Sequence, residues 1–244
     1  MRSSITVSAE RSYEVVVVDD WARELLAFTH GKRILVLAPE ALSAIVQSKL
    51  PGVEVITPNP KTSGGARWNY LAAWAYGVEK FGTDEEKIRS FVRAIYKNVP
   101  VLAKGGRDAT TIFLQRNIGD VLVTFESEVI SVDNEFGAGK VDAVHPSISI
   151  VAENPVAVVE RTVAKKGTGE VAKAYLNYLY SDEAQEIAAK HALRPTNPAI
   201  LKKYSKTFKP LQLFTVNEVF GSFAEAQKVH FNDGGNFDKL YTVK

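Results

Sequence analysis

NPKTSGGAR, residues 59–67, joins a short β-branched stretch at residues 53–57 to a long helical pattern at residues 68–82. A strand that leads through a glycine-rich turn into a helix presents several backbone N–H groups to one point. The helix dipole favours negative charge there, and paired glycines let the main chain approach a ligand closely. The stretch lacks the spacing of either common nucleotide-binding loop. It predicts an oxyanion site, the alternative being an ordinary turn between a strand and a helix.

The rest of the chain alternates in the same way. Residues 1–18 indicate two short strands, the second at 13–18, and further strands are predicted at 33–37, 53–57, 99–103 and 120–125. Helices are predicted at 21–29, 39–50, 68–82, 108–116 and 127–136, from a capping box at Thr83 to residue 97, over most of 169–190, and near 198 and 217. Residues 141–160 hold β-rich pieces broken by prolines. Repeated strand–helix units predict an α/β fold with a mostly parallel, Rossmann-like sheet and helices on both faces.

Composition narrows the classes of function. The 244 residues are 45% hydrophobic, and the net charge is +2. The basic residues are scattered among acidic ones and form no basic stripe of the kind that nucleic-acid binding needs. Cysteine is absent, and no apolar run approaches the roughly 20 residues needed to cross a bilayer. The four histidines lie far apart, in no metal-ligand spacing. We therefore expect no catalytic residues, no metal, no cofactor and no nucleic-acid partner.

A second glycine turn, at residues 104–107, also follows a predicted strand and precedes a predicted helix. In open α/β sheets, ligands collect beyond the carboxyl ends of the strands, which brings such turns together. We predict that main-chain N–H groups of these turns bind the anion, together with one hydroxyl: Ser63, Gly64, Gly65 and Gly106. Arg67 and Arg107 each follow one turn, where they would support the anion from a distance or pair with Glu126 and Glu128.

The stretch PNPKTSGGARWNYLAAWAYG, residues 58–77, resembles the signature of the periplasmic sulfate-binding proteins, the receptors of sulfate/thiosulfate ABC importers. Residues 91–99, 118–122, 174–181, 185–190 and 213–221 agree in order and spacing, so the resemblance covers about residues 51–237. It implies lobes like those of type II periplasmic binding proteins and a tetrahedral oxyanion ligand held by backbone donors. It also implies a membrane permease as partner, a monomer, and a periplasmic location.

Two departures from that family affect the expectations. The family's N-terminal glycine–serine loop and early aspartate turn have no counterpart here, and residues 1–50 resemble, more weakly, the N-terminal edge of 3-dehydroquinate synthases. We therefore interpret residues 1–50 as a replacement segment without a signal peptide, and residues 51–244 as the receptor-like region. The two parts would form either one compact domain or two incomplete lobes. Phe125 stands where the family commonly has an indole N–H donor, and phenylalanine cannot donate a hydrogen bond.

Three hypotheses remain open on the sequence. The first is a sulfate receptor, or a remnant of one with impaired binding. The second is a recombined or engineered α/β protein without a transport role, cytoplasmic as expressed. The third is an enzyme related to dehydroquinate synthase.

Overall fold

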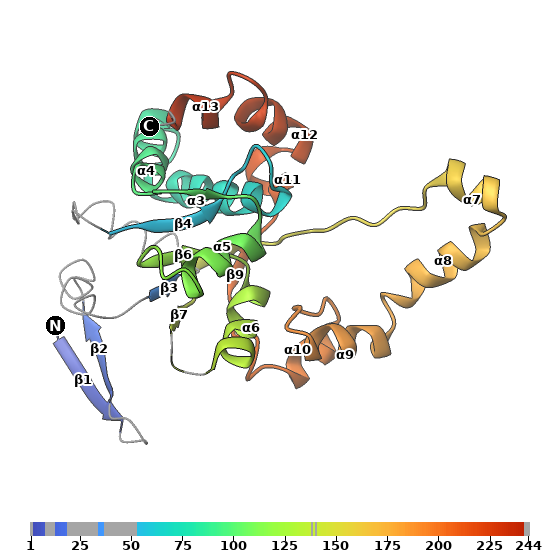
Figure 1. Ribbon diagram of the computed structural model, residues 1–244, viewed down its shortest axis with the longest axis horizontal. Coiled ribbons are helices and arrows are strands. Elements are labelled where there is room, and N and C mark those ends of the chain that lie inside the picture. Colours follow the sequence, from blue (N-terminus) through green and yellow to red (C-terminus); the bar gives the residue numbers. More distant parts are fainter. Residues whose placement is uncertain are drawn as a thin grey trace.

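The computed structural model describes residues 2–7, 13–18, 34–36, 53–137, 139 and 141–241. A five-stranded sheet with the order β5-β4-β6-β3-β7 lies at the centre (Figure 1). Every pairing between these strands is parallel. The strands are β3 (Ile34–Val36), β4 (Val55–Pro58), β5 (Leu102–Ala103), β6 (Val121–Val123) and β7 (Asp142–Val144). The predicted α/β class with a mostly parallel sheet is confirmed.

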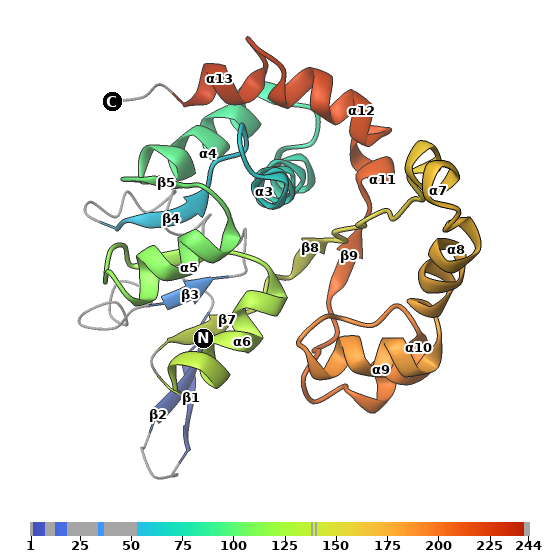
Figure 2. The ribbon, with the colours of Figure 1, turned by 45° about the vertical axis from the view of Figure 1, so that its right-hand side comes forward.

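Helices cover both faces of the sheet because successive strand residues point to opposite sides. Val55 of β4 packs in a cluster with α3 (Gly64–Phe81) and α4 (Glu85–Lys97). Ile56, the next residue, packs in a second cluster with α5 (Gly106–Leu114) and α6 (Glu126–Phe136). All four residues of β4 are buried, as expected for an inner parallel strand. Figure 2 shows α3 and α5 on either side of β4.

The N-terminal residues form an antiparallel pair of strands, β1 (Arg2–Val7) and β2 (Tyr13–Val18). The two strands predicted there are confirmed. The helices predicted at 21–29 and 39–50 lie outside the described residues.

A group of four helices extends away from the sheet (Figures 1 and 2). They are α7 (Glu160–Lys166), α8 (Gly169–Tyr178), α9 (Asp182–Lys190) and α10 (Pro198–Lys203). The chain reaches them after β8 (Ile148–Ile150) and returns through β9 (Gln212–Phe214), which pairs with β8 in parallel. No residue of α7 or α8 is buried, so these two helices lack a core of their own.

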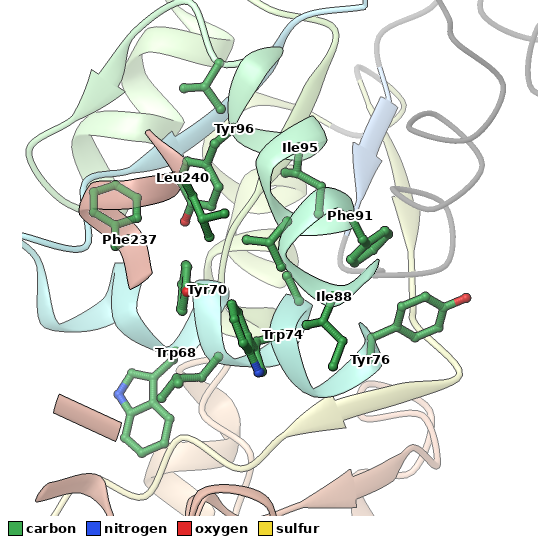
Figure 3. Packing of buried hydrophobic residues seen from close by; sticks show 14 of the residues in the cluster. Trp68, Tyr70, Trp74, Tyr76, Ile88, Phe91, Ile95, Tyr96, Phe237 and Leu240 are labelled. Carbon is green, nitrogen blue, oxygen red and sulfur yellow. The ribbon is translucent and has the colours of Figure 1, made fainter. Parts of the chain in front are cut away.

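The C-terminal residues return to pack on α3 and α4. They form α11 (Val216–Phe220), α12 (Phe223–Ala226), a π-helical turn η1 (Gln227–Phe231) and α13 (Asn236–Leu240). Figure 3 shows the resulting aromatic core, in which Phe237 lies against Tyr70 and Tyr96. The aromatic residues of α3 form part of this core, since Trp68, Tyr70, Trp74 and Tyr76 are buried.

Several boundaries differ from the predictions. Helix α3 begins at Gly64 rather than at residue 68, because a capping residue starts a helix before its apolar spacing becomes visible. The capping box placed at Thr83 is wrong by one residue, since the N-cap of α4 is Asp84, whose side chain accepts from the N–H of Lys87. Strands β5 and β6 are shorter than predicted, and the predictions missed α7 and β9.

Candidate anion-binding site

Three helix N-termini meet at the carboxyl edge of the sheet. Helices α3, α5 and α6 follow β4, β5 and β6 respectively, and these strands are neighbours in the order β5-β4-β6. Because Pro58 pairs with Ala103 at the ends of β4 and β5, the two glycine turns lie side by side, as predicted. The chain runs from β4 to one neighbour and then to the other, so the strand order reverses at β4, where α/β sheets bind ligands.

Asn59 organises the turn that leads into α3. Its N–H donates to the carbonyl of Ala103 at 2.8 Å, and its own carbonyl accepts from the N–H groups of Thr62 and Ser63 at 3.1 and 2.9 Å. Its side-chain oxygen accepts from the N–H of Lys61 at 2.9 Å. We did not single out Asn59 from the sequence, although an Asn-Pro pair is a signal for a turn.

The start of α3 offers donors without a competing acid. Ser63 is the N-cap, and its hydroxyl oxygen accepts from the N–H of Ala66 at 3.3 Å. Its own N–H is engaged with Asn59, which leaves the hydroxyl proton for a ligand. Gly64 and Gly65 are the first helical residues, where N–H groups have no partner within the helix. The first turn of α3 contains no acidic residue, and Gly64 is exposed.

The Phe125 ring lies over this helix start. A Cβ placed on Gly65 would be 3.4 Å from Cζ of Phe125 and 3.8 Å from the hydroxyl oxygen of Ser63. Phe125 is also the N-cap of α6, without a side-chain capping bond. The structure therefore brings together the predicted residues Ser63, Gly65 and Phe125, and the ring supplies no donor of its own.

The second turn supplies the start of α5. Gly106 is its first residue, and the N-cap Gly105 makes no side-chain capping bond. A carboxylate already lies close by, because Asp108 in the first turn accepts from the N–H of Lys104 at 2.8 Å. This end of the site therefore has free backbone donors and a negative charge beside them.

Arg107 forms one of the ion pairs expected for it, and Arg67 does not. Arg107 pairs with Glu128 at 3.3 Å and with Glu135, and these carboxylates raise the pKa of the guanidinium. Arg67 does not pair with Glu126 or Glu128. Its Nε donates to the carbonyl of Pro60 at 3.0 Å and its Nη1 to the side-chain oxygen of Gln227 at 2.7 Å, because the start of α3 lies beside the C-terminal segment.

Glu126 is paired with an arginine that the sequence did not indicate. Arg194 donates two bonds to this carboxylate, at 2.8 and 2.6 Å, and a third to the carbonyl of Lys209 at 2.9 Å. Both side chains are mostly buried, at 21% and 18% exposure, so the pair is better shielded from water than the other ion pairs at this edge. No spacing pattern connects two residues 68 positions apart.

Within the described ranges, no group of three or more histidine, cysteine or acidic side chains is arranged to hold a metal. In the same part of the chain, no helix combines the length and the apolar character needed to cross a membrane.

Comparisons with known proteins show which family the chain is similar to. The family described as bacterial extracellular solute-binding protein matches residues 26–194. The sulfate-binding protein of Escherichia coli (strain K12) is 55% identical over 190 residues, which are 78% of this chain and 58% of that protein. The thiosulfate-binding protein of Pseudomonas aeruginosa (strain PAO1) is 48% identical over 233 residues, 93% of this chain and 70% of that protein.

A solved structure has a similar fold. The sulfate-binding protein SubI from Mycobacterium tuberculosis H37Rv superimposes with a TM-score of 0.67 at 31% identity, over 80% of this chain and 63% of that one. The matched part of the chain spans 58% of the length of the E. coli sulfate-binding protein. The family match begins within residues 1–50, and none of these comparisons supports a recombined origin for that segment. The chain belongs to the bacterial extracellular solute-binding proteins.

Proposed function

We propose that this chain binds sulfate or a similar tetrahedral oxyanion as the solute receptor of an ABC importer, outside the cytoplasmic membrane. The observation that carries the proposal is the meeting of three helix N-termini at one sheet edge, with Gly64 and Gly65 at the start of a helix that has no acidic first turn. Relatives named for sulfate and thiosulfate binding support the choice of ligand. The role is binding and delivery to a membrane permease, with no catalytic step.

The chemistry of the donors favours a fully ionised anion. Backbone N–H groups only donate, and the Ser63 hydroxyl, which already accepts from the N–H of Ala66, has its proton left to donate. Sulfate at neutral pH presents acceptors in every direction. Phosphate carries at least one proton, whose O–H would face another donor and leave both groups unsatisfied. Sulfate should therefore displace phosphate at pH 6 much more readily than the reverse.

A calorimetric titration with sulfate tests the proposal, using the wild type and Gly64→Asp, with Gly64→Asn as the neutral control of equal size. A Cβ at Gly64 would meet no atom within 4 Å, so both variants should fold. Two unit charges about 5 Å apart at an effective dielectric constant of about 20 repel by about 3 kcal/mol. That repulsion predicts a loss of more than about 100-fold in sulfate affinity for Gly64→Asp.

The stability of Gly64→Asp without sulfate should not decrease, although its affinity for sulfate does. An acidic side chain at a helix start is favourable, so the melting temperature of Gly64→Asp without sulfate should not fall. The proposal is wrong if the wild type gives no heat with sulfate, or if Gly64→Asp binds as tightly as Gly64→Asn.

A further inference from the structure

The turn before α3 is tied to the far end of the chain through Lys61. Its ammonium nitrogen lies 3.1 Å from the carbonyl oxygen of Phe231, 3.3 Å from a carboxylate oxygen of Asp233 and 3.0 Å from one of Asp238. An ammonium group has three hydrogens, so this set of acceptors uses all of them. Its carboxylate partners raise the pKa of Lys61, with Asp238 contributing most, so the side chain is charged in this contact.

A second cation ties the same region from the other side. Arg67 donates to Pro60 in the turn and to Gln227, and its guanidinium carbon lies 5.5 Å from the centre of the Phe231 ring. Lys61 and Arg67 therefore bracket the three residues proposed to face the anion. Both reach the same segment, residues 227–238, which we call the brace.

The brace is itself well fixed. Phe231 is buried, and its ring meets Tyr70 of α3 edge-on with centroids 5.1 Å apart. Asp238 also accepts from the N–H of Gly234 at 2.8 Å, which closes the loop between η1 and α13. A Cβ on Gly235 would lie 2.8 Å from the carbonyl oxygen of Asn232, so the backbone is tightly folded there. A segment this constrained can hold the turn in one position.

We propose that Lys61 and Arg67 are positioning residues, through which the brace sets the direction of the donors at Ser63, Gly64 and Gly65. The inference rests on the proposed function. The Lys61 ammonium has no hydrogen left for the anion, and the Arg67 guanidinium is held by its bonds to Pro60 and to Gln227 of the brace. Their effect on affinity is indirect: backbone donors bind a charged oxygen well only when they are held in the right direction before it arrives.

Sulfate affinity is measured first, for Lys61→Met, Asp238→Asn and the double variant. The matched control is Lys87→Met, which removes a lysine from another ion pair, 2.9 Å from Asp84 on α4. Lys61→Met should weaken sulfate binding about tenfold with little change in melting temperature, and Lys87→Met should leave it unchanged. The double variant should be no weaker than the weaker-binding single variant, since both changes break the same contact.

Amide hydrogen exchange of residues 59–66 without sulfate is the second measurement. Lys61→Met should exchange faster there than Lys87→Met, chiefly at Thr62 and Ser63, whose N–H groups bond to Asn59. If Lys61→Met fails to fold, Asp238→Asn carries both measurements. Equal exchange in the variant and the control overturns the inference, and so does faster exchange with unchanged sulfate affinity. If the wild type does not bind sulfate, the proposed function fails, and the exchange comparison alone decides whether the brace holds the turn.

Discussion

Replacing Phe125 with tryptophan should strengthen sulfate binding. The tip of the Phe125 ring lies over the start of α3, since Cζ and Cε2 are 3.4 and 3.5 Å from the place of a Cβ on Gly65. An indole at this position extends over the backbone donors of α3 and adds one N–H to them. Because Gly65 carries no side chain, a ring at position 125 can approach the backbone of this helix start closely.

The size of the gain follows from one additional bond to a charged acceptor. Such a bond contributes about 1.5–3 kcal/mol, which corresponds to roughly 10- to 150-fold in affinity. The larger ring also has a cost, because Phe125 packs partly against the main hydrophobic cluster, and overpacking costs about 1–3 kcal/mol. The overpacking cost lowers the stability of the free and the bound protein alike. We expect a gain in affinity at the lower end of this range, about tenfold.

Calorimetry with sulfate at pH 7 measures the gain, and two further variants show its origin. Phe125→Leu removes the ring without adding a donor and should give no increase. Phe125→Trp combined with Gly65→Ala places a methyl group where the ring tip lies and should cancel most of the increase. The reasoning is refuted if Phe125→Trp keeps its melting temperature and binds sulfate no better than the wild type.

Three more predictions follow from single positions. Gly119 has a φ of +85°, and its Cβ would lie 2.4 Å from Cγ1 of Ile56, so Gly119→Ala should lower the free energy of unfolding by about 3 kcal/mol. Gly167→Ala, at a φ of +66° with nothing within 4 Å, should lower it by only about 1 kcal/mol; equal losses in urea denaturation would contradict a clash. Burial lowers the pKa of His230 to about 4, so the stability it contributes is complete above pH 6.5. As pH falls from 6.5 to 4, the unfolded state binds a proton on this histidine before the folded state does, so the free energy of unfolding decreases by up to about 3 kcal/mol. His230→Gln should remove this part of the pH dependence of thermal unfolding. Asp108→Asn removes a carboxylate from the start of α5 and should raise sulfate affinity about threefold to tenfold in calorimetry. Unchanged affinity would show that this helix start lies away from the anion.

The parts of the fold that depend on neighbouring residues could be predicted from the sequence. The β-branched run at β4 and the glycine turn after it lie within 15 residues of each other, and their pattern gives strand, turn and helix in order. The two glycine turns were expected to meet because parallel strands end at one edge, and the pairing of Pro58 with Ala103 confirms it. The start of α3 was predicted too far along the chain, because Ser63 begins this helix through one side-chain bond that apolar spacing does not reveal.

The contacts that fix the site could not be predicted. Glu126 and Arg194 are 68 positions apart, and Lys61 and Asp238 are 177 apart. Which charges pair over such distances depends on how the helices pack, and any of the 30 basic side chains could serve any of the 28 acidic ones by charge alone. Of the two roles expected for Arg67, the pairing with Glu126 or Glu128 is not formed, since the C-terminal segment occupies the space beside it.

The three helix starts are not equivalent for an anion. Each carries roughly half a unit of positive charge from its dipole, and a carboxylate in the first turn offsets it. Helix α5 has Asp108 there. Helix α6 has Glu126 and Glu128, whose charges are neutralised by Arg194 and Arg107. Only α3 has an acid-free first turn among the three. We therefore propose that an anion at this edge would lie nearest Gly64 and Gly65, where no first-turn carboxylate stands beside the backbone donors.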